Sequence, residues 1–179
     1  MISLGIDPGQ TGGAVFFDGE RVVSCIEWRR SGGAYVCRNK PRQVSRVDHL
    51  WKVAKKIELM AVALDVQCVV LEGMYVPKNA FGGGSVLRAA EARGILSLVH
   101  AMRLKELGVE MFEPRPTHWR KTVFGYSPSR RAAAKKKAQQ FAKVHAKGLK
   151  LLKSDHVCEA FCLARYGFIK MGADNESKK

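Results

Sequence analysis

Hydrophobic residues alternate with small ones at the start of the chain, and this two-residue period predicts a β-strand. Ile2, Leu4 and Ile6 carry the alternation, and Asp7 ends it. Residues 8–13 contain one proline and three glycines, a composition typical of a tight reversal of the chain. The pattern therefore predicts a short buried strand, a turn, and a second strand that runs back through residues 14–18.

Three further segments have strand-like patterns. Residues 21–28 predict a third strand, antiparallel to the second. Residues 67–71 form a continuous apolar run that ends at Glu72, as expected for a central strand covered on both faces. Residues 109–114 predict a last strand, which a proline ends.

Helical spacing predicts helices over residues 44–64, 85–107 and 129–147, a short helix that begins at Pro116, and a final helix that contains residues 155–164. Residues 172–179 are expected to be a disordered tail, which leaves a single domain over residues 1–171. Within the first helix, the expected core positions are Leu50, Trp51, Ala54, Ile57 and Ala61. Within the helix over 129–147, the expected inward positions are Ala133, Phe141 and Val144.

Composition limits the functional classes. The chain has 179 residues, 46% of them hydrophobic, and no run of about 18 apolar residues that would predict a membrane span. Its first residues lack the pattern of a signal peptide, so we expect a cytoplasmic location. The net charge of +15 indicates a polyanionic partner, with nucleic acid favoured over an anionic membrane.

Five cysteines are present, without a CxxC pair, and reduced thiols are the expectation. A zinc site built from His156, Cys158 and Cys162 is a minor alternative, because a fourth ligand is not evident.

Four acidic residues fall at positions that suggest a common site. Asp7 and Glu72 each end a buried strand, and Asp155 and Glu159 lie four apart on one helix face, with His156 three residues before Glu159. Asp7 could instead cap its own turn, and Asp155 could be a helix N-cap. Converging carboxylates repel one another unless a divalent cation neutralises them, and oxygen ligands favour Mg²⁺ or Mn²⁺. Two such ions about 4 Å apart can activate water and stabilise the leaving oxygen of a phosphodiester, which indicates a nuclease.

Basic residues concentrate in the helix over 129–147, and a solvated helix face is the ordinary explanation for such a run. Here no acidic residue balances the charges, which favours contact with phosphates. The loop over 73–85 contains a triple glycine, which fits a phosphate-approaching backbone and a plain flexible loop equally well.

Together these motifs resemble RuvC-type Holliday junction resolvases of the ribonuclease H-like fold, and the phage-borne branch more than the bacterial one. The resemblance covers nearly the whole chain. It rests on the order and spacing of residues 4–9, 70–72 and 91–94, of Pro116 with Trp119 and Arg120, and of residues 137–139 and 155–160.

The resemblance implies an α/β fold with a five-stranded mixed sheet, strands 1–3 antiparallel and 4–5 parallel, flanked by helices. It implies that Asp7 and Glu72 bind metal and that Glu159 takes the fourth acidic position. The third position is Asp155 or His156; we select Asp155, with His156 next. Lys137 is expected near the scissile bond and Tyr75 at the branch point. The full set expected to bind DNA is Tyr75, Lys78, Phe81, Arg93, Arg120, Arg130, Arg131, Lys135, Lys136 and Lys137.

The implied activity is metal-dependent hydrolysis that nicks two strands of a four-way DNA junction, with two Mg²⁺ ions per site and Mn²⁺ as a substitute. Symmetric cuts imply a homodimer with twofold symmetry. A catalytically weak protein that only binds branched DNA is the main alternative. An ATPase of the sugar-kinase type or a transposase core would need more chain.

Overall fold

A five-stranded sheet forms the centre of the protein. The computed structural model describes residues 1–9, 11–31, 34–35, 46–73, 93–94, 104, 106–147 and 154–176. In these residues the strands of the main sheet are β1 (Ile2–Asp7), β2 (Gly12–Phe17), β3 (Val22–Trp28), β6 (Val66–Leu71) and β7 (Glu110–Phe112). A separate small hairpin is formed by β4 (Arg30–Ser31) and β5 (Ala34–Tyr35).

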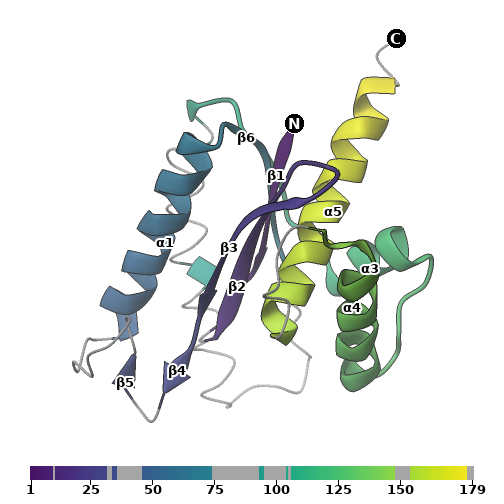
Figure 1. Ribbon diagram of the computed structural model, residues 1–179, viewed down its shortest axis with the longest axis horizontal. Helices are drawn as coiled ribbons and strands as arrows, with labels where there is room; N and C mark the ends of the chain where they lie inside the picture. Colours follow the sequence, from purple (N-terminus) through teal and green to yellow (C-terminus); the bar gives the residue numbers. More distant parts are fainter. Residues whose placement is uncertain are drawn as a thin grey trace.

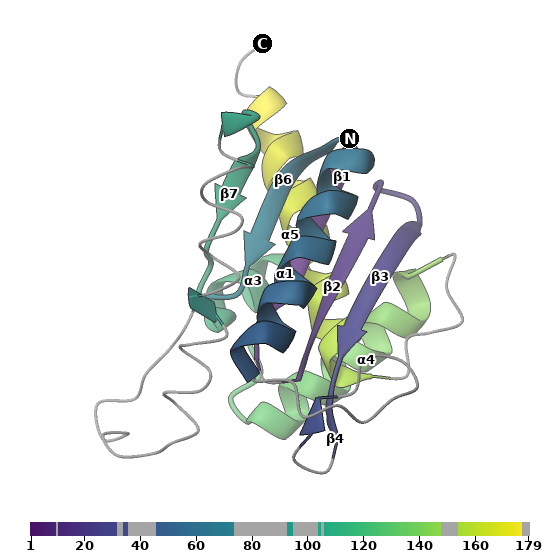
Figure 2. The ribbon, with the colours of Figure 1, turned by 90° about the vertical axis from the view of Figure 1, so that its left-hand side faces the viewer.

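The strands lie in the order β3-β2-β1-β6-β7. β1, β2 and β3 pair antiparallel, whereas β6 pairs parallel with β1 and β7 pairs parallel with β6 (Figure 2). The mixed sheet predicted from the resemblance is therefore confirmed.

Helices cover both faces of the sheet (Figure 1). On one face lies α1 (Arg46–Ala63), which buries Leu50, Ala54 and Ile57 against the strands. On the other face lie α3 (Pro116–Phe124), α4 (Arg131–His145) and α5 (Asp155–Glu176). The strands of the central sheet thus separate two hydrophobic clusters, as expected for buried parallel pairs.

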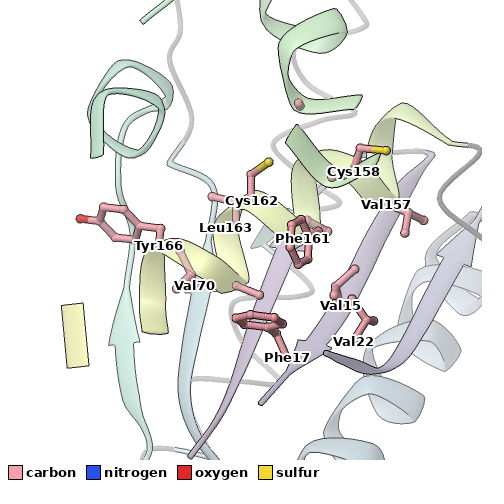
Figure 3. Close-up of a cluster of buried hydrophobic side chains, with 14 of the residues drawn as sticks. Val15, Phe17, Val22, Val70, Val157, Cys158, Phe161, Cys162, Leu163 and Tyr166 are labelled. Atoms are coloured by element: carbon pink, nitrogen blue, oxygen red, sulfur yellow. The ribbon is translucent and has the colours of Figure 1, made fainter. Parts of the chain in front are cut away.

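α5 is the helix that lies directly on the sheet. Its Phe161 packs edge-on against Phe17 of β2, with ring centroids 5.4 Å apart, and Val15 and Val22 lie beside them (Figure 3). The contact is close because two strand residues are glycines. A Cβ on Gly5 would lie 2.1 Å from the carbonyl oxygen of Ala160, and one on Gly13 would lie 2.8 Å from that of His156. The backbone of α5 therefore rests on the backbone of β1 and β2, without side chains between them.

Three predictions about side-chain positions were wrong. Trp51 is 48% exposed, with the Lys55 ammonium 5.6 Å from its ring, because the buried side of α1 runs through Leu50, Val53 and Ala54. Ala133 is exposed, and Val144 is 72% exposed. The buried positions of α4 are Ala134, Ala138 and Ala142, a stripe of small residues four apart that lets α4 lie close to α5.

Two predicted segments have other outcomes. α5 continues through Glu176, so helical backbone extends into the segment 172–179 that was expected to be a disordered tail. The helix predicted over 85–107 lies mostly outside the described residues, although Arg93, Gly94, Leu104 and Glu106 are helical. Among the described residues, no helix is long and apolar enough to cross a membrane.

Candidate active site

Three acidic residues from three different elements lie at one end of the sheet. β1 and β6 are parallel neighbours, so Asp7 and Glu72 leave the sheet at the same edge, and the Glu72 amide donates to the Ile6 carbonyl at 3.2 Å. Glu159 lies on the first turns of α5, above β1, because the glycine contact places the N-terminal part of α5 there. Asp7 and Glu159 are only 8% and 7% exposed.

His156 connects Asp7 to the glycine-rich turn. Its Nδ1 lies 2.6 Å from Oδ2 of Asp7, and its Nε2 lies 3.0 Å from the Thr11 hydroxyl. An ionised carboxylate can only accept, so Nδ1 carries the hydrogen and donates to Asp7. This hydrogen bond raises the pKa of His156 above its usual value of 6.5, although burial acts in the opposite direction. The imidazole is therefore held at both nitrogens, beside the acids.

Glu72 accepts a hydrogen bond from the indole Nε1 of Trp119 at 2.9 Å. Trp119 is fully buried in α3, and it fixes the orientation of the carboxylate. Burial, and then repulsion from Asp7 and Glu159, raise the pKa of Glu72 from 4.5 to about 7. The protein thus holds a carboxylate where its charged form is disfavoured, which is characteristic of functional sites.

Arg120 lies between Glu72 and Glu159. Its Nη2 is 3.4 Å from Oε1 of Glu159 and 3.9 Å from Oε1 of Glu72. Burial and repulsion from Asp7 raise the pKa of Glu159, and Arg120 only partly offsets them. Even with the guanidinium present, the acids therefore carry more negative charge than their surroundings neutralise.

The residues fit a divalent cation by their chemistry. In the part of the chain that is described, no three His, Cys, Asp or Glu side chains are already arranged around one point as a metal site. The oxygen donors are nevertheless those that Mg²⁺ and Mn²⁺ prefer, and two of them have raised pKa values that a cation would lower. A guanidinium already lies between two of the carboxylates, which marks the position as one that attracts positive charge.

Asp155 lies apart from these acids. It is the first residue of α5, and its carboxylate binds the Lys135 ammonium at 3.1 Å and the side-chain amide of Gln139, both on α4. His156, the next residue, contacts Asp7 instead. Of the two candidates for the third position, the structure brings His156 to the other acids and directs Asp155 toward α4.

The two cysteines of α5 pack away from the acids. Cys158 and Cys162 lie in the hydrophobic cluster of α5, where burial raises the pKa of the Cys158 thiol to about 11 (Figure 3). Cys25, Cys68 and Cys162 are free thiols. The zinc alternative has no support in this arrangement, since Cys158 and Cys162 pack among apolar side chains whereas His156 contacts Asp7.

Some of the basic residues expected to bind DNA contact other side chains, and others are exposed on α4. Lys137 lies with its ammonium 5.5 Å from the ring of Tyr126, and Arg93 pairs with Glu113 while its Nε donates to the Glu72 carbonyl at 3.4 Å. Arg130, Arg131 and Lys136 are exposed at the beginning and on the outer side of α4. Tyr75, Lys78 and Phe81 lie outside the described residues.

Two residues of the site were not among the predicted ones. Thr11 holds His156, and Trp119 holds Glu72. Thr11 follows Asp7 within the glycine-rich turn, and Trp119 precedes Arg120 in a quoted motif, so proximity to candidate residues was the only available signal.

Comparisons with known proteins identify a family and a shared fold. A sequence model of the family described as "Crossover junction endodeoxyribonuclease RuvC" matches residues 3–165. A search of curated proteins found no match.

Several solved structures share the fold. The RuvC of Thermus thermophilus in complex with a Holliday junction substrate is 14% identical, with a TM-score of 0.68 and 96% of each chain covered. Another structure of Thermus thermophilus RuvC gives a TM-score of 0.63 at 14% identity, covering 96% of this chain and 97% of that one. The yeast mitochondrial Holliday junction resolvase Ydc2 gives 0.52 at 12% identity, covering 92% of this chain and 76% of that one. The family match spans most of the sequence, and the chain belongs to the RuvC family of crossover junction endodeoxyribonucleases.

Proposed function

We propose that the protein is a divalent-metal-dependent endonuclease that resolves four-way or other branched DNA by paired hydrolysis of phosphodiester bonds. The observation that carries the proposal is the convergence of Asp7, Glu72 and Glu159, delivered by β1, β6 and α5, within a chain of net charge +15. The acids provide a place for cations, and the basic surface provides a place for the DNA backbone. Membership of the RuvC family supports the choice of branched DNA.

Asp7, Glu72 and Glu159 would hold the cations, two Mg²⁺ ions in our proposal, with Mn²⁺ as a substitute. We propose His156 as the next ligand, because it contacts Asp7 whereas Asp155 is engaged by Lys135. A bound divalent cation would lower the pKa of an attacking water and stabilise the leaving oxygen. Trp119 keeps Glu72 oriented, and Asp7 holds Nδ1 of His156, so Nε2, which contacts the Thr11 hydroxyl, is the nitrogen that would turn to a cation.

The outer side of α4 would hold phosphates near the acids. The Lys135 ammonium of α4 contacts Asp155, the first residue of α5. The first turns of α4 therefore lie close to the end of α5 that carries His156 and Glu159. Contacts of this kind position DNA by its backbone, which suits recognition of branch shape over base sequence. Cutting two strands at symmetric positions requires two such sites, and we propose a homodimer with twofold symmetry.

The test is cleavage of an immobile four-way DNA junction, compared with linear duplex of the same sequence, in Mg²⁺, in Mn²⁺ and in chelator. Asp7→Asn should abolish cutting while junction binding persists. Asp18→Asn, an aspartate at the β2–β3 turn that binds Arg21, serves as the matched control and should cut normally. Paired, metal-dependent nicks near the branch support the proposal. Tight junction binding without cutting in any metal would instead indicate a structural junction-binding protein, and neither binding nor cutting would refute both functions.

A further inference from the structure

Arg120 is the one cationic side chain that contacts two of the described acids at once, Glu72 and Glu159. Its side chain is 14% exposed, and its guanidinium lies 5.0 Å from the ring of Trp119. Trp119 in turn donates to Glu72, so the aromatic ring and the carboxylates together define where the guanidinium lies.

The bonding of this guanidinium is incomplete. In the described part of the structure, the Nε of Arg120 is buried and has no hydrogen-bond partner. Buried donors are nearly always paired, because an unpaired one loses its bonds to water. The attraction of the two carboxylates therefore holds Arg120 in a position that does not satisfy its own hydrogen bonds.

This position is the one that a metal ion would need. The carboxylates of Glu72 and Glu159 are proposed ligands. A divalent cation between them would be repelled at close range by the positive charge of Arg120. Both cations cannot neutralise the same two carboxylates at that distance. We propose that Arg120 is a built-in counterion, which partly neutralises Glu72 and Glu159 in the metal-free protein and which an entering divalent cation must displace.

The proposal rests on the proposed function, since it takes these acids as metal ligands. It predicts that Arg120 lowers the affinity of the site for metal, in contrast to a residue that merely orders the acids. Two charges at this range interact several times more strongly near a protein surface than in water, so the competing effect is large.

The experiment is calorimetric titration of the full chain with Mn²⁺ at pH 8.0, without DNA. Arg120→Gln should bind Mn²⁺ about tenfold more tightly than the wild type, or more. Arg120→Lys keeps the charge but not the planar fork, and its affinity should stay within about threefold of the wild type. Lys121→Gln is the matched control, because it removes an exposed charge from the next residue and should change affinity by less than about twofold.

A second measurement uses the wild-type protein alone, so the inference stays testable even if Arg120→Gln fails to fold. The side-chain Nε–H resonance of Arg120, identified by its loss in Arg120→Lys, should shift during titration with Mg²⁺ and saturate together with binding. Unchanged or weaker Mn²⁺ binding by Arg120→Gln, or an Arg120 resonance unaffected by saturating Mg²⁺, would overturn the inference and leave the proposed nuclease intact. Absence of metal binding by the wild type would overturn the metal site itself and the inference with it.

Discussion

Replacing Glu72 with Gln removes a charge that the folded, metal-free protein disfavours. Burial and the neighbouring acids raise the pKa of Glu72 from 4.5 to about 7. One pKa unit corresponds to 1.36 kcal/mol, so ionised Glu72 destabilises the folded state by roughly 3 kcal/mol above pH 7. Glutamine keeps the shape of the side chain and an oxygen that can accept from Trp119. We therefore expect Glu72→Gln to be more stable than the wild type in the absence of metal.

The effect has a defined pH dependence. The folded-state pKa of Glu72 lies above the unfolded value, so the protonated form contributes stability that is fully present below about pH 4.5 and is lost as the pH rises through about 7. The advantage of the variant should consequently be small at pH 5 and reach its full size at pH 8. In a chain of this length, about 3 kcal/mol corresponds to a rise in Tm of about 6–12 °C.

Thermal unfolding followed by circular dichroism in chelator, at pH 5 and pH 8, measures the difference. Addition of Mg²⁺ at pH 8 should raise the Tm of the wild type and leave that of Glu72→Gln nearly unchanged. Glu20→Gln, at an exposed position in the β2–β3 turn, should match the wild type under all conditions. If Glu72→Gln is no more stable than the wild type at pH 8 without metal, the electrostatic account of the site is wrong.

Three further predictions concern the framework of the site. In a denaturant titration, Gly5→Ala should lower the free energy of unfolding by about 2 kcal/mol or more, because the new Cβ would clash with the backbone of α5, and it should abolish cleavage. Gly172→Ala is the control: its Cβ would contact nothing, so its stability should be unchanged or slightly higher. Thr11→Val should lower the cleavage rate by about tenfold, because the imidazole loses the hydroxyl contact that orients its ring, whereas Thr11→Ser should keep both the contact and the rate. His156→Asn should weaken Mn²⁺ binding by about 10- to 100-fold, and Asp155→Asn should leave it within a few-fold; the reverse order would identify Asp155 as the ligand.

Local patterns were sufficient to predict the five strands of the main sheet, and the resemblance supplied their mixed pairing. The alternation in residues 2–6 and the apolar run in 67–71 each reflect how a single segment is buried. Both segments form strands in the structure, as predicted. Side-chain exposure was harder to predict. Trp51 and Val144 are apolar residues at helical spacing, yet Trp51 lies one position after the buried Leu50 and Val144 two positions after the buried Ala142. The buried stripe of α4 consists of alanines, whose weak hydrophobicity gives little signal in the sequence.

The candidate site required information that spacing does not contain. Asp155 and His156 are adjacent in the sequence, but one residue rotates a helix by about 100°, so only the packing of α5 decides which of them meets Asp7. Arg120 was predicted to bind DNA because the sequence shows its positive charge but not the carboxylates that lie beside it in the fold. Its contacts with Glu72 and Glu159 join residues far apart in the chain, and no local pattern reports such contacts.

The direct contact of α5 with β1 at Gly5 also bears on how such a protein can diverge. Where two backbones touch, the separation between the helix and the strand is independent of side-chain size. Mutations that enlarge or shrink the surrounding core can therefore accumulate while the offset between Asp7 and Glu159 stays constant.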